Sequence, residues 1–463
     1  MSQANLPAGL EPLDDLDLAG LPARPRTSIP SIRLNIRGRS VSLRGLRRPP
    51  AGILRWLLIL GPGLITASAG NDAGGIATYS AAGARFGYDL IWVMVVITVS
   101  LAVVQEMCAR LGAATGRGLL DLVRERYGIS WALFVMATLF IANAGVIITE
   151  FMGIGAAAGL FGLPRLVVVP LAAALLWYLV IYGSYAWVEK IFLGMTLVFF
   201  AYPVAAVLAQ PDWGDVLRGA LIPTIQFDQE YLFLLVGLMG TTISPFMLFF
   251  QQSSTVERGV ARRHYGPERL DAHIGAIFSN LIAITMIVVA GATLHQAGQT
   301  NIESAADAAQ ALEPIAGPAA TTLFAIGLLG ASLLAGAVLP LTTAYAVSEV
   351  FGMPKGVSLD FRRAPLFFRL FTGMIVLGAG LSLIPGLPVF DWLVAVQVLN
   401  GVLLPVLLIF ILRLINDERL MGPLRNTRLY NVLGWGTMAL ITTAVVILLG
   451  SQVLITLGII QPT

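Results

Sequence analysis

Two short segments place polar and helix-disfavouring residues in the middle of otherwise apolar stretches. The first is residues 70–75, with the sequence GNDAGG, and the second is residues 241–245, with the sequence TTISP. Proline removes a backbone donor, and glycine lowers the cost of leaving helical geometry. Both segments therefore predict a break in a helix. At such a break, carbonyl oxygens that are released from the helix can coordinate a cation.

Asp72 is the only acidic residue at the centre of either segment. A carboxylate deep in a membrane costs at least about 2.5 kcal/mol on insertion scales, so it indicates function by default. A structural alternative is that Asp72 caps the half-helix that follows it, which need not exclude metal binding. Thr241, Thr242 and Ser244 could line the same site, or they could mediate helix packing or bond back to their own helix.

The composition indicates an integral membrane protein. Of the 463 residues, 57% are apolar and 12% are charged, and the mean hydropathy is +0.82. An average soluble domain carries roughly 25% charged residues, so an ordinary soluble protein is excluded. The single cysteine excludes a disulfide framework, and no paired catalytic carboxylates, Ser-His arrangement or H-E-x-x-H motif is present. We therefore expect a protein that is not an enzyme and has no cofactor and no nucleic-acid partner.

Eleven apolar stretches of about 20 residues or more predict an all-α polytopic membrane protein. They lie near residues 54–80, 88–112, 131–157, 165–185, 190–209, 231–250, 272–294, 319–347, 365–384, 388–412 and 430–456. We expect a disordered cytoplasmic tail at 1–50, a transmembrane transporter domain at 51–456 and a short extracytoplasmic C-terminus at 457–463. The bilayer is thus the expected surrounding, and we expect a monomer.

The positions of lysine and arginine predict the orientation. With the N-terminus inside, all but three of the 29 basic residues fall in cytoplasmic segments, the exceptions being Arg85, Arg165 and Arg218. We expect a multi-pass protein of the cell membrane (inner or plasma membrane) with a cytoplasmic N-terminus and an extracytoplasmic C-terminus. The outer loops are acidic, which predicts either a rim that concentrates cations or merely solvated loops.

The two predicted breaks fall in spans one and six. An offset of five is expected when two five-helix halves form an inverted repeat. Interrupted helices at matching positions of two halves are the best sequence indication of a transporter's substrate site.

The segment from Gly61 to Val93 resembles the start of the Nramp family of divalent metal transporters. The likeness continues at 105–119 (QEMCARLGAATGRGL), 240–246 (GTTISPF), 342–352 (TTAYAVSEVFG) and 397–410 (QVLNGVLLPVLLIF). The resemblance implies a LeuT-type fold with two five-helix inverted repeats and an eleventh helix. It also implies that helices one and six are broken at the midplane around a metal site, and that transport proceeds by alternating access.

Two departures from the family pattern affect the implied site. Typical members carry Asp-Pro-Gly-Asn, whereas here Asp72 is kept and the Asn ligand becomes Gly75. Typical members carry Met-Pro-His-Asn, whereas here the Met is Ser244 and the His is Phe246. A thioether favours softer transition metals, so its replacement by a hydroxyl removes discrimination against Mg²⁺. The vacated volume would suit a partly hydrated ion. This pattern resembles the Nramp-related magnesium transporter branch.

Three further positions follow from the same resemblance. Gln397 matches the tenth-helix Gln that approaches the metal when the site occludes, the alternative being a polar interhelical bond. Glu150 matches the family's Asp on the proton path, whereas Gly153 replaces a second acidic residue. Arg363 and Arg369 could be salt-bridge partners of Glu150 or could simply be positive charges of an inside loop.

We therefore expect import of Mg²⁺, and of Mn²⁺ as a second substrate, by alternating access driven by membrane potential and without proton coupling. The alternative is a proton-coupled Mn²⁺/Fe²⁺ symporter of the Nramp type. A sodium-coupled organic-solute transporter is a weaker alternative, because Asp72 would repel a carboxylate. The expected metal site comprises Asp72, Ala69, Gly70, Gly75, Thr241, Thr242, Ser244 and Gln397. The expected proton path or salt-bridge network comprises Glu150, Arg363 and Arg369.

Overall fold

The computed structural model describes residues 32–36, 39–43, 70–182, 201–260, 262, 265–312, 317, 320–357, 359–457 and 459. The chain divides into two compact units, Met1–Trp56 and Leu57–Thr463. In the first unit, strands β1 (Ile32–Ile36) and β2 (Arg39–Leu43) form an antiparallel pair. The rest of the predicted tail lies outside the described residues, so its disorder stays a prediction.

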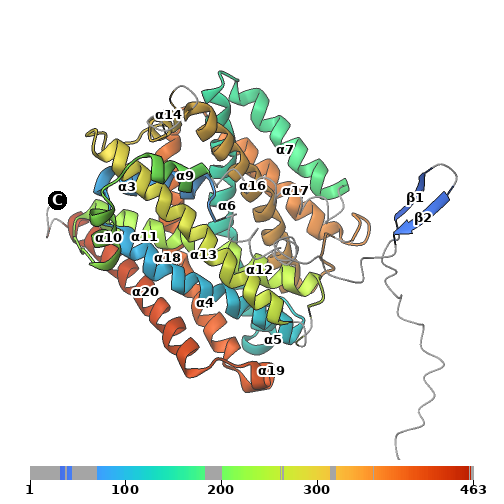
Figure 1. The fold of residues 1–463 in the computed structure, drawn as a ribbon. Coiled ribbons are helices and arrows are strands. Elements are labelled where there is room, and N and C mark those ends of the chain that lie inside the picture. Colours follow the sequence, from blue (N-terminus) through green and yellow to red (C-terminus); the bar gives the residue numbers. More distant parts are fainter. Residues whose placement is uncertain are drawn as a thin grey trace, which may run out of the picture. The chain divides into compact units, whose positions relative to one another are not determined.

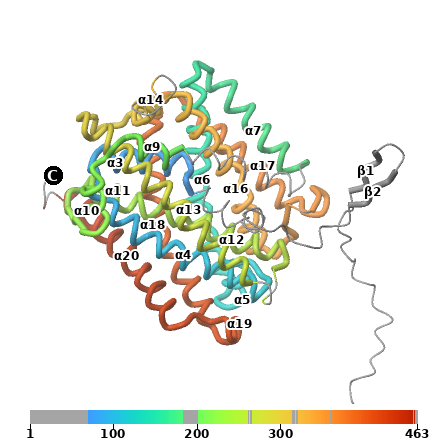
Figure 2. Tube along the Cα trace, viewed as in Figure 1, coloured from blue at the N-terminus to red at the C-terminus, as the bar shows by residue number. Residues whose placement is uncertain are grey.

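The described part of the second unit is all-helical, as predicted (Figures 1 and 2). Its first half contains α3 (Ala73–Phe86), α4 (Ile91–Thr115), α5 (Leu119–Tyr127), α6 (Ile129–Leu160), α7 (Arg165–Tyr182), α9 (Ala201–Leu208), α10 (Trp213–Leu221), α11 (Gln229–Thr242) and α12 (Pro245–Glu257). Its second half contains α13 (Tyr265–Ala290), the π-helix η5 (Gly291–His295), α14 (Ala305–Gln310), α16 (Ala320–Phe351), α17 (Pro365–Ser382), α18 (Val389–Ile415), α19 (Glu418–Met421), the 3₁₀ helix η7 (Gly422–Leu424) and α20 (Arg428–Thr456).

Nine helices of the described residues are long and apolar enough to cross a membrane, when α11 with α12 and α13 with η5 are each counted as one. They match nine of the eleven predicted spans. The first and fifth predicted spans lie partly outside the described residues, which include only α3 and α9 of them.

The predicted break of span six is confirmed. Helix α11 ends at Thr242 and α12 begins at Pro245, with Ser244 as the N-cap in an extended conformation. Proline is tolerated at the first position of a helix, where its missing N–H would have no partner anyway. In span one, α3 begins directly after Asp72. The residues before Gly70 lie outside the described part of the chain, so the break in span one stays a prediction.

The tenth span, α18, comes into close backbone contact with α11 near the break of span six. An added Cβ on Gly240 of α11 would lie 2.1 Å from the carbonyl oxygen of Gln397 and 2.3 Å from the amide nitrogen of Gly401 on α18. Only a residue without a side chain permits this approach. Because α18 also packs against α3, the side chain of Gln397 is carried to the start of α3.

Candidate metal centre

Asp72 lies fully buried at the N-terminus of α3 and caps it. Its Oδ1 accepts a hydrogen bond from the amide of Gly75 at 2.6 Å. The Nε2 of Gln397 donates to the same carboxylate, at 3.2 Å from Oδ1 and 3.4 Å from Oδ2. The structural role that the sequence allowed for Asp72 is therefore present. Oδ2, whose one described contact is the longer one to Gln397, is the carboxylate oxygen more available to a cation.

The amide of Gln397 is oriented by its neighbour on α18. Its Oε1 accepts a hydrogen bond from Nδ2 of Asn400 at 2.9 Å, which directs Nε2 towards Asp72. A cation requires an oxygen ligand, so the amide must turn over and release Asn400 before Oε1 can face an ion beside Asp72. Gln397 therefore lies beside Asp72 as predicted, but as a hydrogen-bond donor to the carboxylate.

Three oxygens surround the open side of Gly75. An added Cβ there would lie 2.9 Å from the Gly70 carbonyl oxygen, 2.9 Å from Thr241 Oγ1 and 3.2 Å from Asp72 Oδ1. The Thr241 hydroxyl is buried and has no hydrogen-bond partner among the described residues. Such an orphaned group costs about 1 to 3 kcal/mol, which a bound cation would offset. We expected the missing side chain at Gly75 to leave space for a hydrated ion. In this conformation the three oxygens occupy the space beside Gly75.

Two of the predicted ligands on span six face elsewhere. The hydroxyl of Ser244 lies 2.9 Å from the carbonyl oxygens of both Gly240 and Thr241, so it bonds back to the end of α11. It thereby engages the Thr241 carbonyl, which was itself a candidate ligand. The hydroxyl of Thr242 lies 3.4 Å from the Tyr79 hydroxyl. Ala69 lies outside the described residues.

Glu150 shares the N-terminus of α3 with Asp72. It is fully buried on α6, and its Oε2 accepts a hydrogen bond from the amide of Ala73 at 3.3 Å. The partial positive charge of a helix N-terminus favours carboxylates, whereas the two like charges oppose each other. An added Cβ on Gly153 would lie 2.5 Å from both Ala73 Cβ and Ser332 Oγ, so no acidic side chain fits there without rearrangement.

Among the described residues, no ion pair joins Glu150 to Arg363 or Arg369, which was one of the two interpretations of these arginines. Arg363 lies 4.0 Å from Asp360, and its side chain is 76% exposed. Arg369 is also exposed, whereas Glu150 is fully buried. Arg363 lies in the turn before α17 and Arg369 in the first turns of α17, so their interpretation as positive charges of an inside loop stays a prediction.

The sequence interpretation did not include Asn71 among the site residues. Asn71 is fully buried and donates from Nδ2 to the Ser279 carbonyl at 3.3 Å, and its Oδ1 has no partner among the residues described. Its place directly before Asp72 in the broken segment was the available signal. Within the described ranges, no three His, Cys, Asp or Glu residues are grouped so that they could hold a metal ion. A cation at Asp72 would therefore need neutral oxygens and water to complete its shell.

A cavity of about 490 Å³ reaches the start of α3. Its lining includes Ala73 at one side and Glu303 and Ser304, next to α14, at another. The Ala73 amide is the group that Glu150 accepts from. The cavity therefore extends from the predicted extracytoplasmic side to the helix end that carries both buried carboxylates.

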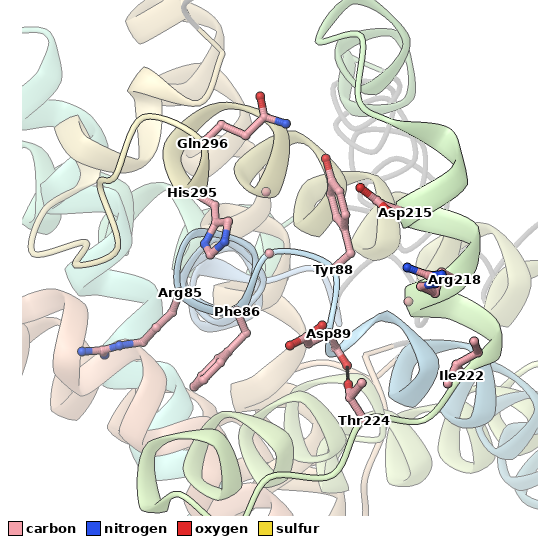
Figure 3. A pocket seen from close by; sticks show the side chains of 13 residues that line it. Arg85, Phe86, Tyr88, Asp89, Asp215, Arg218, Ile222, Thr224, His295 and Gln296 are labelled. Atoms are coloured by element: carbon pink, nitrogen blue, oxygen red, sulfur yellow. Dashed lines mark hydrogen bonds between the residues drawn. The ribbon is translucent and has the colours of Figure 1, made fainter. Parts of the chain in front are cut away.

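A second cavity, of about 520 Å³, lies at the other end of α3 and carries charges of both signs (Figure 3). Its charged lining residues are Arg85, Asp89, Asp215 and Arg218. Glu230, one of the predicted rim acids, forms an ion pair with Arg85. Basic residues thus offset part of the predicted acidic rim.

This fold has a broken sixth span with a buried carboxylate and buried polar oxygens beside it, an arrangement that is typical of membrane transporters. Residues 63–451 match the family model described as "Natural resistance-associated macrophage protein-like". The chain belongs to the Nramp family, as its motifs predicted, and is accordingly a transporter and not an enzyme.

Curated relatives cover most of the chain. It is 31% identical over 402 residues to the "Divalent metal cation transporter MntH" of Klebsiella pneumoniae, covering 84% of this chain and 92% of the relative. It is 32% identical over 414 residues to the protein of the same name from Yersinia pestis, covering 86% and 95%.

Solved structures confirm the predicted LeuT-type fold. A manganese transporter of Eremococcus coleocola superposes with a TM-score of 0.69 at 20% identity, covering 88% of this chain and 90% of that one. Mhp1, a nucleobase-cation-symport-1 family transporter, superposes with a TM-score of 0.50 at 13% identity, covering 85% and 93%.

The crowding at Gly75 makes a testable prediction. Gly75→Asn restores the residue typical of the family, but its side chain must displace the Gly70 carbonyl or Thr241. We expect a loss of about 1 to 3 kcal/mol in stability, seen as a lower thermal unfolding midpoint, and no gain in Mn²⁺ affinity. Gly373→Asn on α17 is the control, because no described atom beyond its own stretch of helix backbone lies within 4 Å of its added Cβ. An unchanged midpoint with tighter Mn²⁺ binding would contradict the described packing.

Proposed function

We propose that this protein imports divalent metal ions by alternating access, with Asp72 as the main ligand and with Mg²⁺ and Mn²⁺ as substrates. The observation that carries the proposal is the buried Asp72 carboxylate beside the Gly70 carbonyl and the Thr241 hydroxyl, which has no hydrogen-bond partner within the described part of the chain, at the break of span six. One carboxylate with neutral oxygens is a hard donor set, which suits Mg²⁺ and Mn²⁺.

Two kinds of support bear on the choice of ion. The names of the relatives, a divalent metal cation transporter and a manganese transporter, support Mn²⁺. The residues favour Mg²⁺ as an additional substrate, because Ser244 stands where typical members carry the metal-binding Met. The hydroxyl of Ser244 bonds back to α11 in this conformation. Ser244 therefore supplies neither a sulfur ligand nor a free hydroxyl to an ion beside Asp72.

The geometry suggests how binding is linked to closure. Gln397 donates to the Asp72 carboxylate, so an arriving cation competes with it for the same oxygens. Turning the amide over would exchange a donor for an oxygen ligand and release Asn400. Because α18 contacts α11 through Gly240, a change at Gln397 is transmitted to the broken sixth span.

Membrane potential supplies enough driving force without protons. Inward movement of a divalent cation gains about 4.6 kcal/mol per 100 mV, from about 2.3 kcal/mol per charge. Phe246 occupies the position of the family's His and is buried, and Gly153 lacks the second acidic side chain. We therefore infer uptake without obligatory proton movement.

One observation favours the alternative, a proton-coupled Mn²⁺/Fe²⁺ symporter. Glu150 is a buried carboxylate at the same helix end as Asp72, where the entry of a cation would change its electrostatic surroundings. In that mechanism Glu150 would release a proton inward with each ion.

The ligand role of Asp72 can be separated from its cap. Asparagine caps helices about as well as aspartate, so Asp72→Asn should fold as the parent does. It should also lose at least about tenfold in Mg²⁺ and Mn²⁺ uptake by proteoliposomes, equivalent to about 1.4 kcal/mol. Asp228→Asn is the matched control, because Asp228 caps α11 through the amide of Tyr231 at 3.1 Å. Equal uptake by both variants would exclude Asp72 as the ligand.

Restoring the thioether should change selectivity. We expect Ser244→Met to make Mn²⁺ uptake much more sensitive to Cd²⁺ and less sensitive to Mg²⁺, because a soft ligand joins the shell. Ser244→Ala removes the hydroxyl without adding sulfur and should keep the parent's competition profile. The measurement is inhibition of Mn²⁺ uptake by each ion. Identical profiles for Met and Ala variants would show that this position does not reach the ion.

A further inference from the structure

A cavity with an arginine-rich lining lies away from the metal centre. It has a volume of about 910 Å³ and lies between the end of α5, the end of α18, α19 and the first turns of α20. Figure 1 shows α5 and α19 towards the same end of the helical unit. Its lining includes Arg126, Arg413 and Arg419 from three different helices, together with Tyr127 and Trp435.

The carboxylates of this cavity are already engaged. Asp417 lies 2.8 Å from Arg126 and also accepts from the amide of Arg419 at 2.9 Å. Glu418 lies 3.8 Å from Arg425, which is not part of the lining. Among the described residues, no ion pair involves the guanidinium of Arg413 or Arg419, and both side chains are exposed. The lining therefore carries three arginines against two carboxylates, and two of the arginines have no ion pair among the described residues.

The cavity sits where the polar and apolar surfaces meet. The candidate membrane span of α18 ends at Ile415 and that of α20 begins at Arg428. Trp435 lies about two helical turns into α20 and is 42% exposed, and the nearby Leu429 and Val432 are 64% and 70% exposed. Trp and Tyr are typical of the interface between headgroups and acyl chains, whereas exposed Leu and Val indicate a surface that faces lipid.

We propose that this cavity binds the headgroup of an anionic phospholipid, with Arg413 and Arg419 on the phosphate and the acyl chains along the exposed face of α20. A guanidinium is suited to phosphate because its planar fork donates two parallel hydrogen bonds. Basic pockets between membrane helices are typical sites for such headgroups. A lipid bound here would connect the end of α18 to α5 and α20.

Binding can be measured with a fluorescent phosphatidylglycerol, labelled on its acyl chain, in detergent micelles that contain the full chain. Fluorescence anisotropy reports the bound fraction. Each arginine near a headgroup contributes about a fivefold change in affinity, so Arg413→Gln combined with Arg419→Gln should weaken binding about thirtyfold. The matched control is Arg362→Gln combined with Arg369→Gln, which removes two exposed arginines outside the cavity that form no ion pair among the described residues and should bind as the parent does.

A variant that is expected to strengthen binding excludes misfolding as the cause of weaker binding. Asp417→Asn removes the charge that neutralises Arg126 while keeping a cap on α19, so it should tighten binding several-fold. Phosphatidylglycerol should displace the probe, whereas phosphatidylcholine and glycerol 3-phosphate should not. Equal binding by parent and the cavity variant would overturn the site. Displacement by glycerol 3-phosphate would overturn the lipid as its ligand and indicate a soluble phosphate ester.

Discussion

The first turn of α3 requires partners for backbone N–H groups in the middle of a membrane protein. Water is scarce at that depth, so side chains must supply those partners. Asp72 accepts from Gly75 and Glu150 accepts from Ala73, so two buried carboxylates satisfy one helix end. Much of the proposed site follows from this constraint, because the groups that stabilise the half-helix are also the charges that would attract a cation.

The surrounding packing keeps those charges together without a basic partner in the described residues. Gln397 reaches Asp72 because α11 and α18 approach to backbone contact at Gly240, and Asn400 holds its amide in the donating orientation. At the same place, the hydroxyl of Thr241 has no hydrogen-bond partner in the residues that the structure describes. Without an ion, some polar groups of the site have hydrogen-bond partners. The oxygens that lack a partner in the described residues are those that we propose a cation would use.

Much of this arrangement could be predicted from the sequence. The break at Pro245 follows from the backbone chemistry of proline, and the importance of Asp72 follows from the cost of a charge at that depth. The proximity of Gln397 came from family resemblance, because residues 325 positions apart leave no local signal. Local rules do not say which span will lie beside a break.

Side-chain orientation could not be predicted in the same way. Ser244 is a cap residue whose hydroxyl can turn into the site or back to its helix, and only the tertiary structure decides. The space beside Gly75 depends on how closely Gly70 and Thr241 approach. Arg363 was a plausible partner for Glu150 by charge alone, yet burial separates the two.

The central claim is that a single buried carboxylate, with hard oxygen ligands, supports ion entry driven by voltage. The most direct test is Mg²⁺ and Mn²⁺ flux into proteoliposomes that contain a pH dye, under imposed potentials that are negative inside. The account predicts entry of both ions, at rates that rise with the potential, without internal acidification. Entry of Mn²⁺ alone, accompanied by acidification that persists without a potential, would contradict it and establish the proton-coupled mechanism.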